Sequence, residues 1–288
     1  MKQREELKGV LYCLPFLLSF LVFTVWPLLY CLHLVFYRWN LGGAPHFVGL
    51  KYIFRMFQDE TYLHAWQNTL GFVFLNVPLQ IVLGLCLAVA LNKKIKAREW
   101  FRGCYFFPVI ISGSVTTILW LYLLNQEQGL VNQFLSGFLH LPRVPWLTGE
   151  SFVIASLALH ATWKNLGLTV VLLLAGLQSI PGSIYEAAEL DGARGWLRFW
   201  KITLPLLNPA FVMVVLLCTM GAFSLFVEPL VMTNFGGPGD ASMSLYLYIY
   251  KKFAFWDMSY AATLGLATAA GVLLVVRLQK RLLEQDVG

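Results

Sequence analysis

The feature that most constrains this chain is a series of six long stretches that carry almost no charge. A helix needs about 20 predominantly apolar residues to cross the hydrocarbon core of a bilayer. Six windows reach or approach that length, and only one of them is interrupted, by Lys164. The pattern predicts an all-α integral membrane protein with six transmembrane helices. We expect these helices near residues 10–36, 67–91, 104–124, 152–177, 207–232 and 260–280.

The composition agrees with a chain whose solvent is largely lipid. Hydrophobic residues make up 58% of the sequence and charged residues 12%, whereas an average soluble domain has about 25% charged residues. The first charge-free run, Val10 to Tyr37, is longer than the apolar core of a cleaved signal peptide, which has about 7–15 residues. We therefore expect a retained first span and a single transmembrane domain over residues 1–288.

The distribution of lysine and arginine predicts the orientation of the spans. If the N-terminus is inside, the inner segments carry 14 of the 21 Lys and Arg residues and the outer segments carry six. Cytoplasmic loops are enriched in these residues, so both termini are expected in the cytoplasm. This asymmetry also accounts for the net charge of +6, and the basic balance requires no nucleic-acid partner.

The chain lacks the motifs of energy-converting and hydrolytic sites. It contains neither the G-x-x-x-x-G-K-[ST] phosphate loop nor the H-E-x-x-H zinc motif, and its five histidines are scattered. We expect no catalytic residue, no metal site and no cofactor on this chain. Any energy source for work at the membrane should then lie on another protein.

The expected inner loop between the fourth and fifth spans, residues 178–206, is unusually long. Pro181-Gly182 should end the fourth span, and Ser183 followed by Glu186 fits a capping box. Gly192 suits a left-handed helix stop. A second short helix should follow and end before Pro205. Physical reasoning alone leaves open a helix that merely lies on the membrane surface.

The spacing of this loop resembles a known signature. The pattern E-A-A, three residues, G, nine residues, I-x-L-P stands at Glu186-Ala187-Ala188, Gly192 and Ile202-Thr203-Leu204-Pro205. It is similar to the loop of permease subunits of bacterial ABC importers, and most similar to sugar permeases of the maltose and glycerol-phosphate type. The resemblance covers essentially the whole chain, with its core near residues 66–280. The last outer loop departs from the family, because Asn234-Phe235 precede Gly236-Gly237-Pro238 where Thr-x-Gly-Gly-Pro is usual.

This resemblance implies a role and a set of partners. The loop would be a cytoplasmic coupling helix that docks on an ATPase subunit. The chain would form half of the pathway for a sugar or oligosaccharide delivered by an extracytoplasmic binding protein. A second, homologous permease and two ATPase copies, which would use the ATP and Mg²⁺, would complete the importer in a bacterial inner or plasma membrane. The residues expected to couple to the ATPase are Glu186, Ala187, Ala188, Asp191 and Gly192.

Ionisable residues inside spans are costly and usually face a wet cavity or the bundle interior. Lys164, with its neighbours Trp163 and Asn165, and Glu228 are therefore candidates for the translocation pathway. Two alternatives remain open for Lys164, an ion pair with an acid such as Glu228 and contact with backbone carbonyls. Three alternatives remain open for the function: import of glycerol phosphate or another polar solute, a secondary transporter, and a membrane-embedded enzyme.

Overall fold

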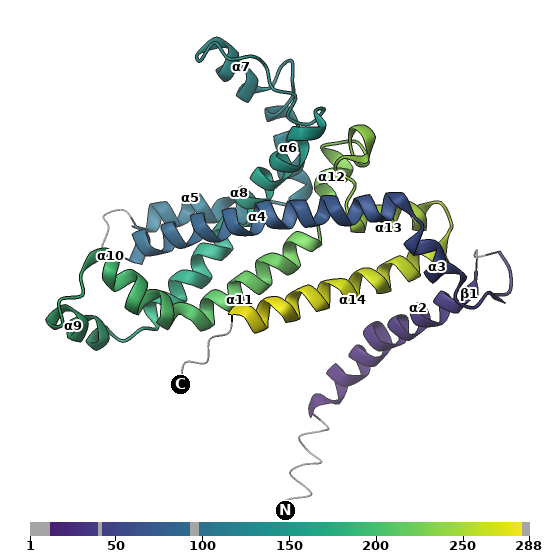
Figure 1. Ribbon diagram of the computed structural model, residues 1–288, viewed down its shortest axis with the longest axis horizontal. Coiled ribbons are helices and arrows are strands. Elements are labelled where there is room, and N and C mark those ends of the chain that lie inside the picture. Colours follow the sequence, from purple (N-terminus) through teal and green to yellow (C-terminus); the bar gives the residue numbers. More distant parts are fainter. Residues whose placement is uncertain (1–11, 40–41, 93–97, 284–288) are drawn as a thin grey trace, which may run out of the picture. The chain divides into compact units, whose positions relative to one another are not determined.

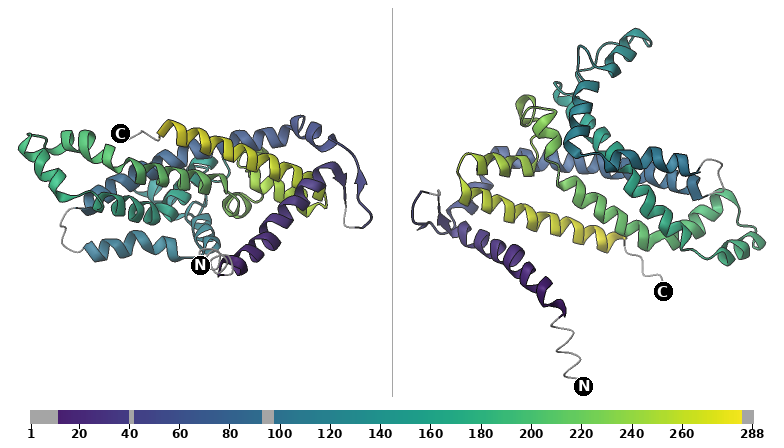
Figure 2. Two further views of the ribbon diagram at one scale, coloured as in Figure 1. Left: turned by 90° about the horizontal axis from the view of Figure 1, so that it is seen from below. Right: turned by 180° about the vertical axis from the view of Figure 1, so that it is seen from behind.

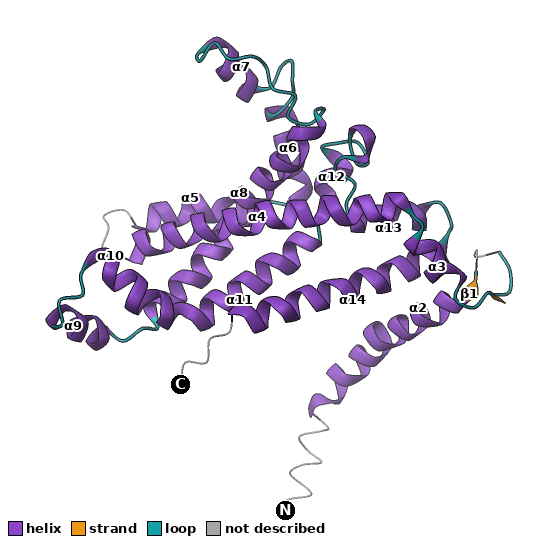
Figure 3. Ribbon diagram, in the orientation of Figure 1, coloured by secondary structure: helices purple, strands orange, loops and turns teal. Residues whose placement is uncertain are grey.

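The computed structural model describes residues 12–39, 42–92 and 98–283, and most of these residues are helical (Figures 1 and 3). Residues 10 and 11, the expected beginning of the first span, lie outside the described residues. The single β-ladder in the described ranges pairs β1 with β2, antiparallel, with Tyr37 opposite Phe47. The elements are η1 (Leu21–Val25), α2 (Trp26–Phe36), β1 (Tyr37–Arg38), β2 (His46–Phe47), α3 (Lys51–Phe57), α4 (Glu60–Asn92), α5 (Arg98–Ile110), α6 (Gly113–Leu123), α7 (Leu130–Gly137), α8 (Glu150–Gln178), α9 (Gly182–Leu190), α10 (Gly195–Arg198), η2 (Phe199–Thr203), α11 (Leu204–Phe223), α12 (Val227–Val231), η3 (Pro238–Asp240), α13 (Leu245–Ala254) and α14 (Met258–Leu283).

Five helices are long and apolar enough to cross a membrane, and they coincide with five of the six predicted spans. They are Tyr12–Phe36, Glu60–Asn92, Glu150–Gln178, Gly195–Val231 and Met258–Leu283. The sixth prediction, one helix over 104–124, needs correction. The segments Gly103–Ile110 and Gly113–Leu123 meet at an angle of 107°, because Ser112 adopts an extended conformation (ψ 137°) between them.

The chain divides into two compact units. The first comprises residues 1–60 and 249–270, and the second comprises residues 61–248 and 271–288. In the first unit, the most apolar window of the helix Tyr12–Phe36 contains no buried residue. A helix that is apolar on every side is typical of a membrane span.

A charged and aromatic cluster fastens α3 to the beginning of α14 within the first unit. The guanidinium of Arg55 lies 4.0 Å from the centre of the Tyr260 ring, and its Nη1 donates to Asp257 Oδ2 at 2.8 Å. The Tyr260 hydroxyl donates to Asp59 Oδ2 at 2.6 Å. An arginine over an aromatic face adds cation–π attraction to the ion pair, so this unit is organised by polar contacts at the helix ends.

The second unit is organised around α8, which packs against α5 and α11. The helices approach closely at Gly167 of α8, where an added Cβ would lie 2.5 Å from the carbonyl oxygen of Tyr105. Small residues permit such close backbone contact between membrane helices. The α9 segment projects from the helices of this unit away from α7 (Figures 1 and 2).

The helix that follows the inner loop does not end before Pro205, contrary to the sequence prediction. It runs without a break from α10 through η2 into α11, and Pro205 occupies the first turn of α11. The π-type turn of η2 explains this continuity, since the Leu204 N–H bonds to the Phe199 carbonyl five residues back. Proline cannot donate an intrahelical bond and clashes with the carbonyl four residues before it, and the wider π turn relieves both conflicts.

The two ends of the segment that contains α7 are linked by one buried side chain, Asn132, which is 0% exposed. Its Nδ2 donates to the carbonyl oxygens of Gln126 at 3.1 Å and Val144 at 2.9 Å. Its Oδ1 accepts from the Val144 N–H at 3.1 Å and from Trp146 Nε1 at 3.1 Å. One amide thereby joins both ends of the loop.

We predict that Asn132→Ala lowers the stability of the purified protein by at least about 2 kcal/mol, because buried polar groups left without partners cost about 1–3 kcal/mol each. Thermal unfolding followed by tryptophan fluorescence measures the change. The matched control is Gln133→Ala, because Gln133 is exposed and makes one bond, to the Gln128 carbonyl. Equal melting temperatures for both variants would contradict this role of Asn132.

Candidate functional site

A polar cavity of about 250 Å³ lies among α4, α8, α11 and the beginning of α12 in the second unit. Its walls are mainly apolar, as expected inside a membrane protein, but one set of side chains can form hydrogen bonds with a solute. These are Asn76, Gln80, Asn165, Thr169, Cys218, Ser224 and Glu228. Ligand sites usually combine an apolar lining with a few placed polar groups, so this cavity is the strongest candidate for a solute site.

Most of the amide N–H groups of the cavity are used within the protein, namely both of Asn76 and one of the two on Gln80 and on Asn165. Asn76 Nδ2 donates to Thr162 Oγ1 at 2.9 Å, and Gln80 Nε2 donates to Thr169 Oγ1 at 2.7 Å. Asn165 Nδ2 donates at 2.9 Å to the carbonyl one turn earlier in α8. Within the described ranges, no hydrogen bond is recorded to the side-chain oxygen of any of the three amides. The cavity therefore offers mainly acceptors, which suit a solute rich in hydroxyl donors.

Glu228 is the one charged residue among those lining the cavity. Its Oε1 lies 3.7 Å from Nδ1 of His160, whose side chain is fully buried while that of Glu228 is 21% exposed. The other ring nitrogen of His160 lies 3.3 Å from Thr116 Oγ1 of α6. Sequence reasoning missed His160, because histidines alone gave no sign that α6, α8 and α12 meet there.

The predicted pathway residues of α8 separate in the structure. Successive residues of an α-helix point about 100° apart, so three neighbours cannot share one face. Asn165 lines the cavity, whereas Trp163 packs on Trp120 with ring centres 5.7 Å apart. Glu228, predicted independently, lines the same cavity as Asn165.

Lys164 turns toward the break between α5 and α6. Its Nζ donates to the carbonyl oxygens of Pro108 at 3.1 Å and Ile111 at 2.6 Å. Helix carboxyl ends carry partial negative charge and favour cations, so the ammonium stabilises the end of α5. This is the backbone-carbonyl alternative left open by the sequence. The Glu228 carboxylate instead lies 3.7 Å from Nδ1 of His160.

Five further polar cavity residues were not predicted, although the sequence contained a signal for the first three: Asn76, Gln80, Thr169, Cys218 and Ser224. Asn76 and Gln80 stand four residues apart in α4, as do Asn165 and Thr169 in α8. Residues at this spacing share one helix face. A pair of uncharged polar residues on one face of an apolar span is therefore an informative pattern. Cys218 carried no comparable signal.

The predicted coupling segment contains a short helix with a well-defined end. At the carboxyl end of α9, the Ala193 N–H bonds to the Ala188 carbonyl at 2.8 Å and the Gly192 N–H to the Glu189 carbonyl at 3.2 Å. With Gly192 at φ 79°, these bonds form a Schellman motif. The predicted glycine stop is thus present.

The predicted capping box at the other end of α9 is wrong. The helix begins at Gly182 with Pro181 as its N-cap, and no side chain caps it. Ser183 therefore lies inside the first turn, where its hydroxyl cannot act as an N-cap. Glu186, Ala187, Asp191 and Gly192 are exposed, whereas Ala188 is buried.

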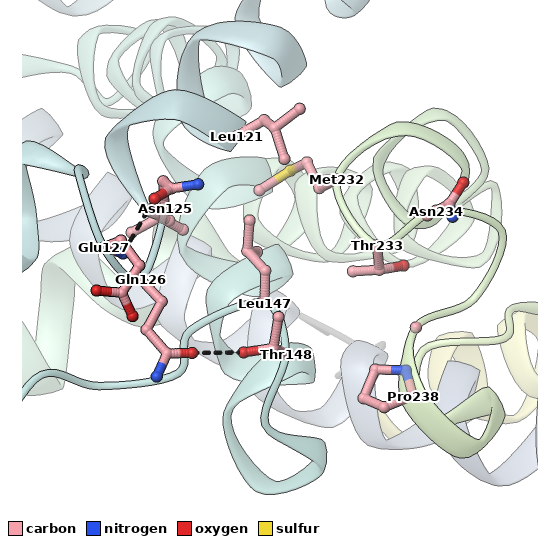
Figure 4. Close-up of a pocket in the computed structure, with 12 residues that line it drawn as sticks. Leu121, Asn125, Gln126, Glu127, Leu147, Thr148, Met232, Thr233, Asn234 and Pro238 are labelled. Carbon is pink, nitrogen blue, oxygen red and sulfur yellow. Dashed lines mark hydrogen bonds between the residues drawn. The ribbon is translucent and has the colours of Figure 1, made fainter.

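A second pocket, of about 580 Å³, lies between the end of α6, the following loop and the segment after α12 (Figure 4). Several of its polar groups bond to one another or to nearby residues. Thr148 Oγ1 donates to Gln126 Oε1 at 2.9 Å, and Glu127 Oε2 pairs with Arg143 at 2.7 Å. These contacts join residues of the loop that lines the pocket to one another and to nearby residues. Within the described residues, no group of three or more His, Cys, Asp or Glu side chains could hold a metal ion.

Comparison with known proteins decides the family. The model of the family described as "Binding-protein-dependent transport system inner membrane component" matches residues 80–287. The chain belongs to this family. It is 33% identical to the arabinooligosaccharides transport system permease protein AraP of Bacillus subtilis, covering 92% of this chain and 85% of that protein.

Two further relatives support the assignment of this permease. It is 32% identical to the trehalose/maltose transport system permease protein MalF of Thermococcus litoralis, covering 95% of this chain and 92% of that protein. A crystal structure of a bacterial ABC transporter that imports the acidic polysaccharide alginate has the same fold, with a TM-score of 0.84 at 22% identity over the whole of both chains. The permease is therefore a multi-pass membrane component of an ABC importer.

We predict that Lys164→Met lowers the stability of this permease by about 1–3 kcal/mol. Hydrogen bonds from a charged donor contribute about 1.5–3 kcal/mol each, and removal of a partly buried charge offsets part of that loss. Unfolding midpoints in lipid nanodiscs measure the effect. Lys201→Met is the control, because Lys201 is exposed. A Lys164→Met midpoint equal to that of the control would show that the carbonyl contacts contribute nothing.

Proposed function

We propose that this permease forms half of the translocation pathway for a sugar or oligosaccharide, and that the solute passes through the cavity among α4, α8, α11 and α12. The observation that carries the proposal is the acceptor-rich lining of that cavity, which matches the hydroxyl groups of a saccharide. The named functions of the relatives point the same way, since AraP belongs to an arabinooligosaccharide system and MalF to a trehalose and maltose system.

The proposed partners follow from the family and from the missing phosphate loop. A second, homologous permease would supply the other half of the pathway, and two copies of a cytoplasmic ATPase would bind the ATP and Mg²⁺. An extracytoplasmic binding protein would deliver the saccharide, in keeping with the family description. The membrane would be a bacterial inner or plasma membrane with both termini of the chain in the cytoplasm, as the excess of Lys and Arg in the inner segments favours.

The coupling role is proposed for α9. The helix is short and projects from the second unit, and its terminal glycine turn fixes the direction in which the chain returns to α10. Glu186 and Ala187 present an exposed, slim surface that a cleft of the ATPase could enclose. Asp191 and Gly192 would keep the helix end in its Schellman geometry. Ala188 is buried and would pack the helix against the rest of the protein.

A sugar is a better fit than glycerol phosphate, because the cation that favoured an anionic solute is engaged elsewhere. The Lys164 ammonium bonds to two carbonyls at the end of α5 and is absent from the residues that line the cavity. A secondary transporter or a membrane-embedded enzyme would leave the coupling motif without a role.

Substitution at Asn165 tests the pathway. The complete transporter, reconstituted in liposomes with its binding protein, should lose at least about tenfold in ATP-driven uptake of labelled oligosaccharides on Asn165→Leu, because the solute loses an acceptor and a polar surface. Leu159→Ala is the control, since Leu159 is an exposed residue of α8 outside the cavity lining and alanine adds no polar group to the span. Uptake that survives Asn165→Leu unchanged would contradict the pathway.

Substitution at Glu186 tests the coupling role. Glu186→Lys reverses a charge on the exposed surface of α9 and should reduce both uptake and solute-stimulated ATP hydrolysis at least about tenfold, because an ATPase cleft that accepts the Glu186 carboxylate would meet a cation in its place. Insertion of the chain into the membrane should persist. Glu189→Lys makes the same charge change on the same helix, where Glu189 already pairs with Arg194 at 3.6 Å, and should have the smaller effect. A larger effect of Glu189→Lys than of Glu186→Lys would contradict docking through Glu186.

A further inference from the structure

We propose that Glu228 is a specificity-determining residue that reserves the cavity for neutral, hydroxyl-rich solutes and excludes acidic saccharides. This inference rests on the proposed function, because it concerns the cavity through which the solute would pass. It also names the solute class more narrowly than the family does, since the family fold occurs in an importer of an acidic polysaccharide. The selectivity must therefore lie in side chains and not in the fold.

The first argument is the charge of the lining. Sixteen residues line the cavity, and they include Glu228 but no Lys, Arg or His. A carboxylate or phosphate on the solute would approach the Glu228 carboxyl group with no lining cation to compensate. In a cavity with apolar walls such repulsion is poorly screened. A neutral hydroxyl, by contrast, can donate to the Glu228 carboxylate, and hydrogen bonds to an ionised acceptor are strong.

The second argument is the direction of the hydrogen bonds. Asn76 Nδ2 donates twice within the protein, to the Ala158 carbonyl and to Thr162 Oγ1, while Gln80 and Asn165 each donate one of their two amide hydrogens. The hydroxyls of Thr169 and Ser224 donate to carbonyls in their own helices, at 3.4 and 3.1 Å. An acidic group needs donors, and these five side chains retain only one amide hydrogen on Gln80 and one on Asn165. The lining is therefore richer in acceptors than in donors, which favours hydroxyl donors over anions.

The third argument is the position of the carboxylate. Glu228 follows the break between α11 and α12, and its Oε1 lies 3.7 Å from the buried His160. Thr116 contacts the other ring nitrogen of His160 at 3.3 Å, so the carboxylate lies at the edge of the cavity beside a histidine positioned from α6 and α8. Lys164, the nearest candidate to neutralise an anionic solute, bonds instead to the Pro108 and Ile111 carbonyls.

The native Cys218, which lines the cavity, permits a test that does not depend on knowing the solute. The other four cysteines are replaced by serine, and the assembled transporter in nanodiscs is treated with three methanethiosulfonates of similar size. One reagent is neutral and carries a hydroxyl, one is anionic and one is cationic. Each rate is divided by the rate of the same reagent with a free thiol in solution.

We expect the anionic reagent to modify Cys218 at least about tenfold more slowly than the neutral one, because like charges repel strongly at close range. Glu228→Gln should reduce this difference to within about threefold by accelerating the anionic reagent. Glu127→Gln, which removes a carboxylate from the other pocket, should leave the difference intact. Equal normalised rates in the unsubstituted protein, or a difference that Glu228→Gln leaves unchanged, would overturn the selectivity role of Glu228 but leave the proposed pathway standing. Failure of all three reagents to reach Cys218 would contradict the cavity itself, and with it the proposed pathway.

Discussion

The constraint on which the rest of this structure depends is that backbone groups in a membrane cannot bond to water. Each unsatisfied N–H or C=O group there costs several kcal/mol, so a span can break only where protein groups take over its bonds. Lys164 does so for Pro108 and Ile111 at the end of α5. Ser244 does so after α11, where its hydroxyl donates to the Leu225 carbonyl at 2.6 Å.

These side-chain hydrogen bonds permit the two helix breaks that position the residues around the cavity. The break after α11 allows the chain to place Glu228 beside the cavity, and the break after α5 allows α6 to bring Thr116 against His160. At the opposite end of α11, the π turn of η2 carries the helix past Pro205 and joins it without interruption to α10, which follows α9 after the non-helical residues 191–194. A movement of α10 would therefore be transmitted along one continuous helix toward the cavity wall.

The sequence predicted the spans well, because length and lack of charge are sufficient to identify an apolar helix. It predicted the glycine turn at Gly192 for an equally local reason. It did not predict the bend at Ser112, because the carbonyl oxygens exposed by the bend accept hydrogen bonds from Lys164, a residue more than 50 positions away. The pathway prediction was partly informative: Asn165 and Glu228 line one cavity, while Lys164 and Trp163 face other neighbours. The prediction grouped Trp163, Lys164 and Asn165, although residues adjacent in a helix point in different directions.

The central claim is that saccharide occupies the cavity among α4, α8, α11 and α12. Cryo-electron microscopy of the assembled transporter in nanodiscs, with its binding protein and a saturating oligosaccharide, tests this most directly. Solute density is expected within hydrogen-bond distance of the Asn165 and Gln80 side-chain oxygens, with a hydroxyl directed toward Glu228. Solute density elsewhere in the transmembrane region, with this cavity filled by lipid or by rearranged side chains, would contradict it.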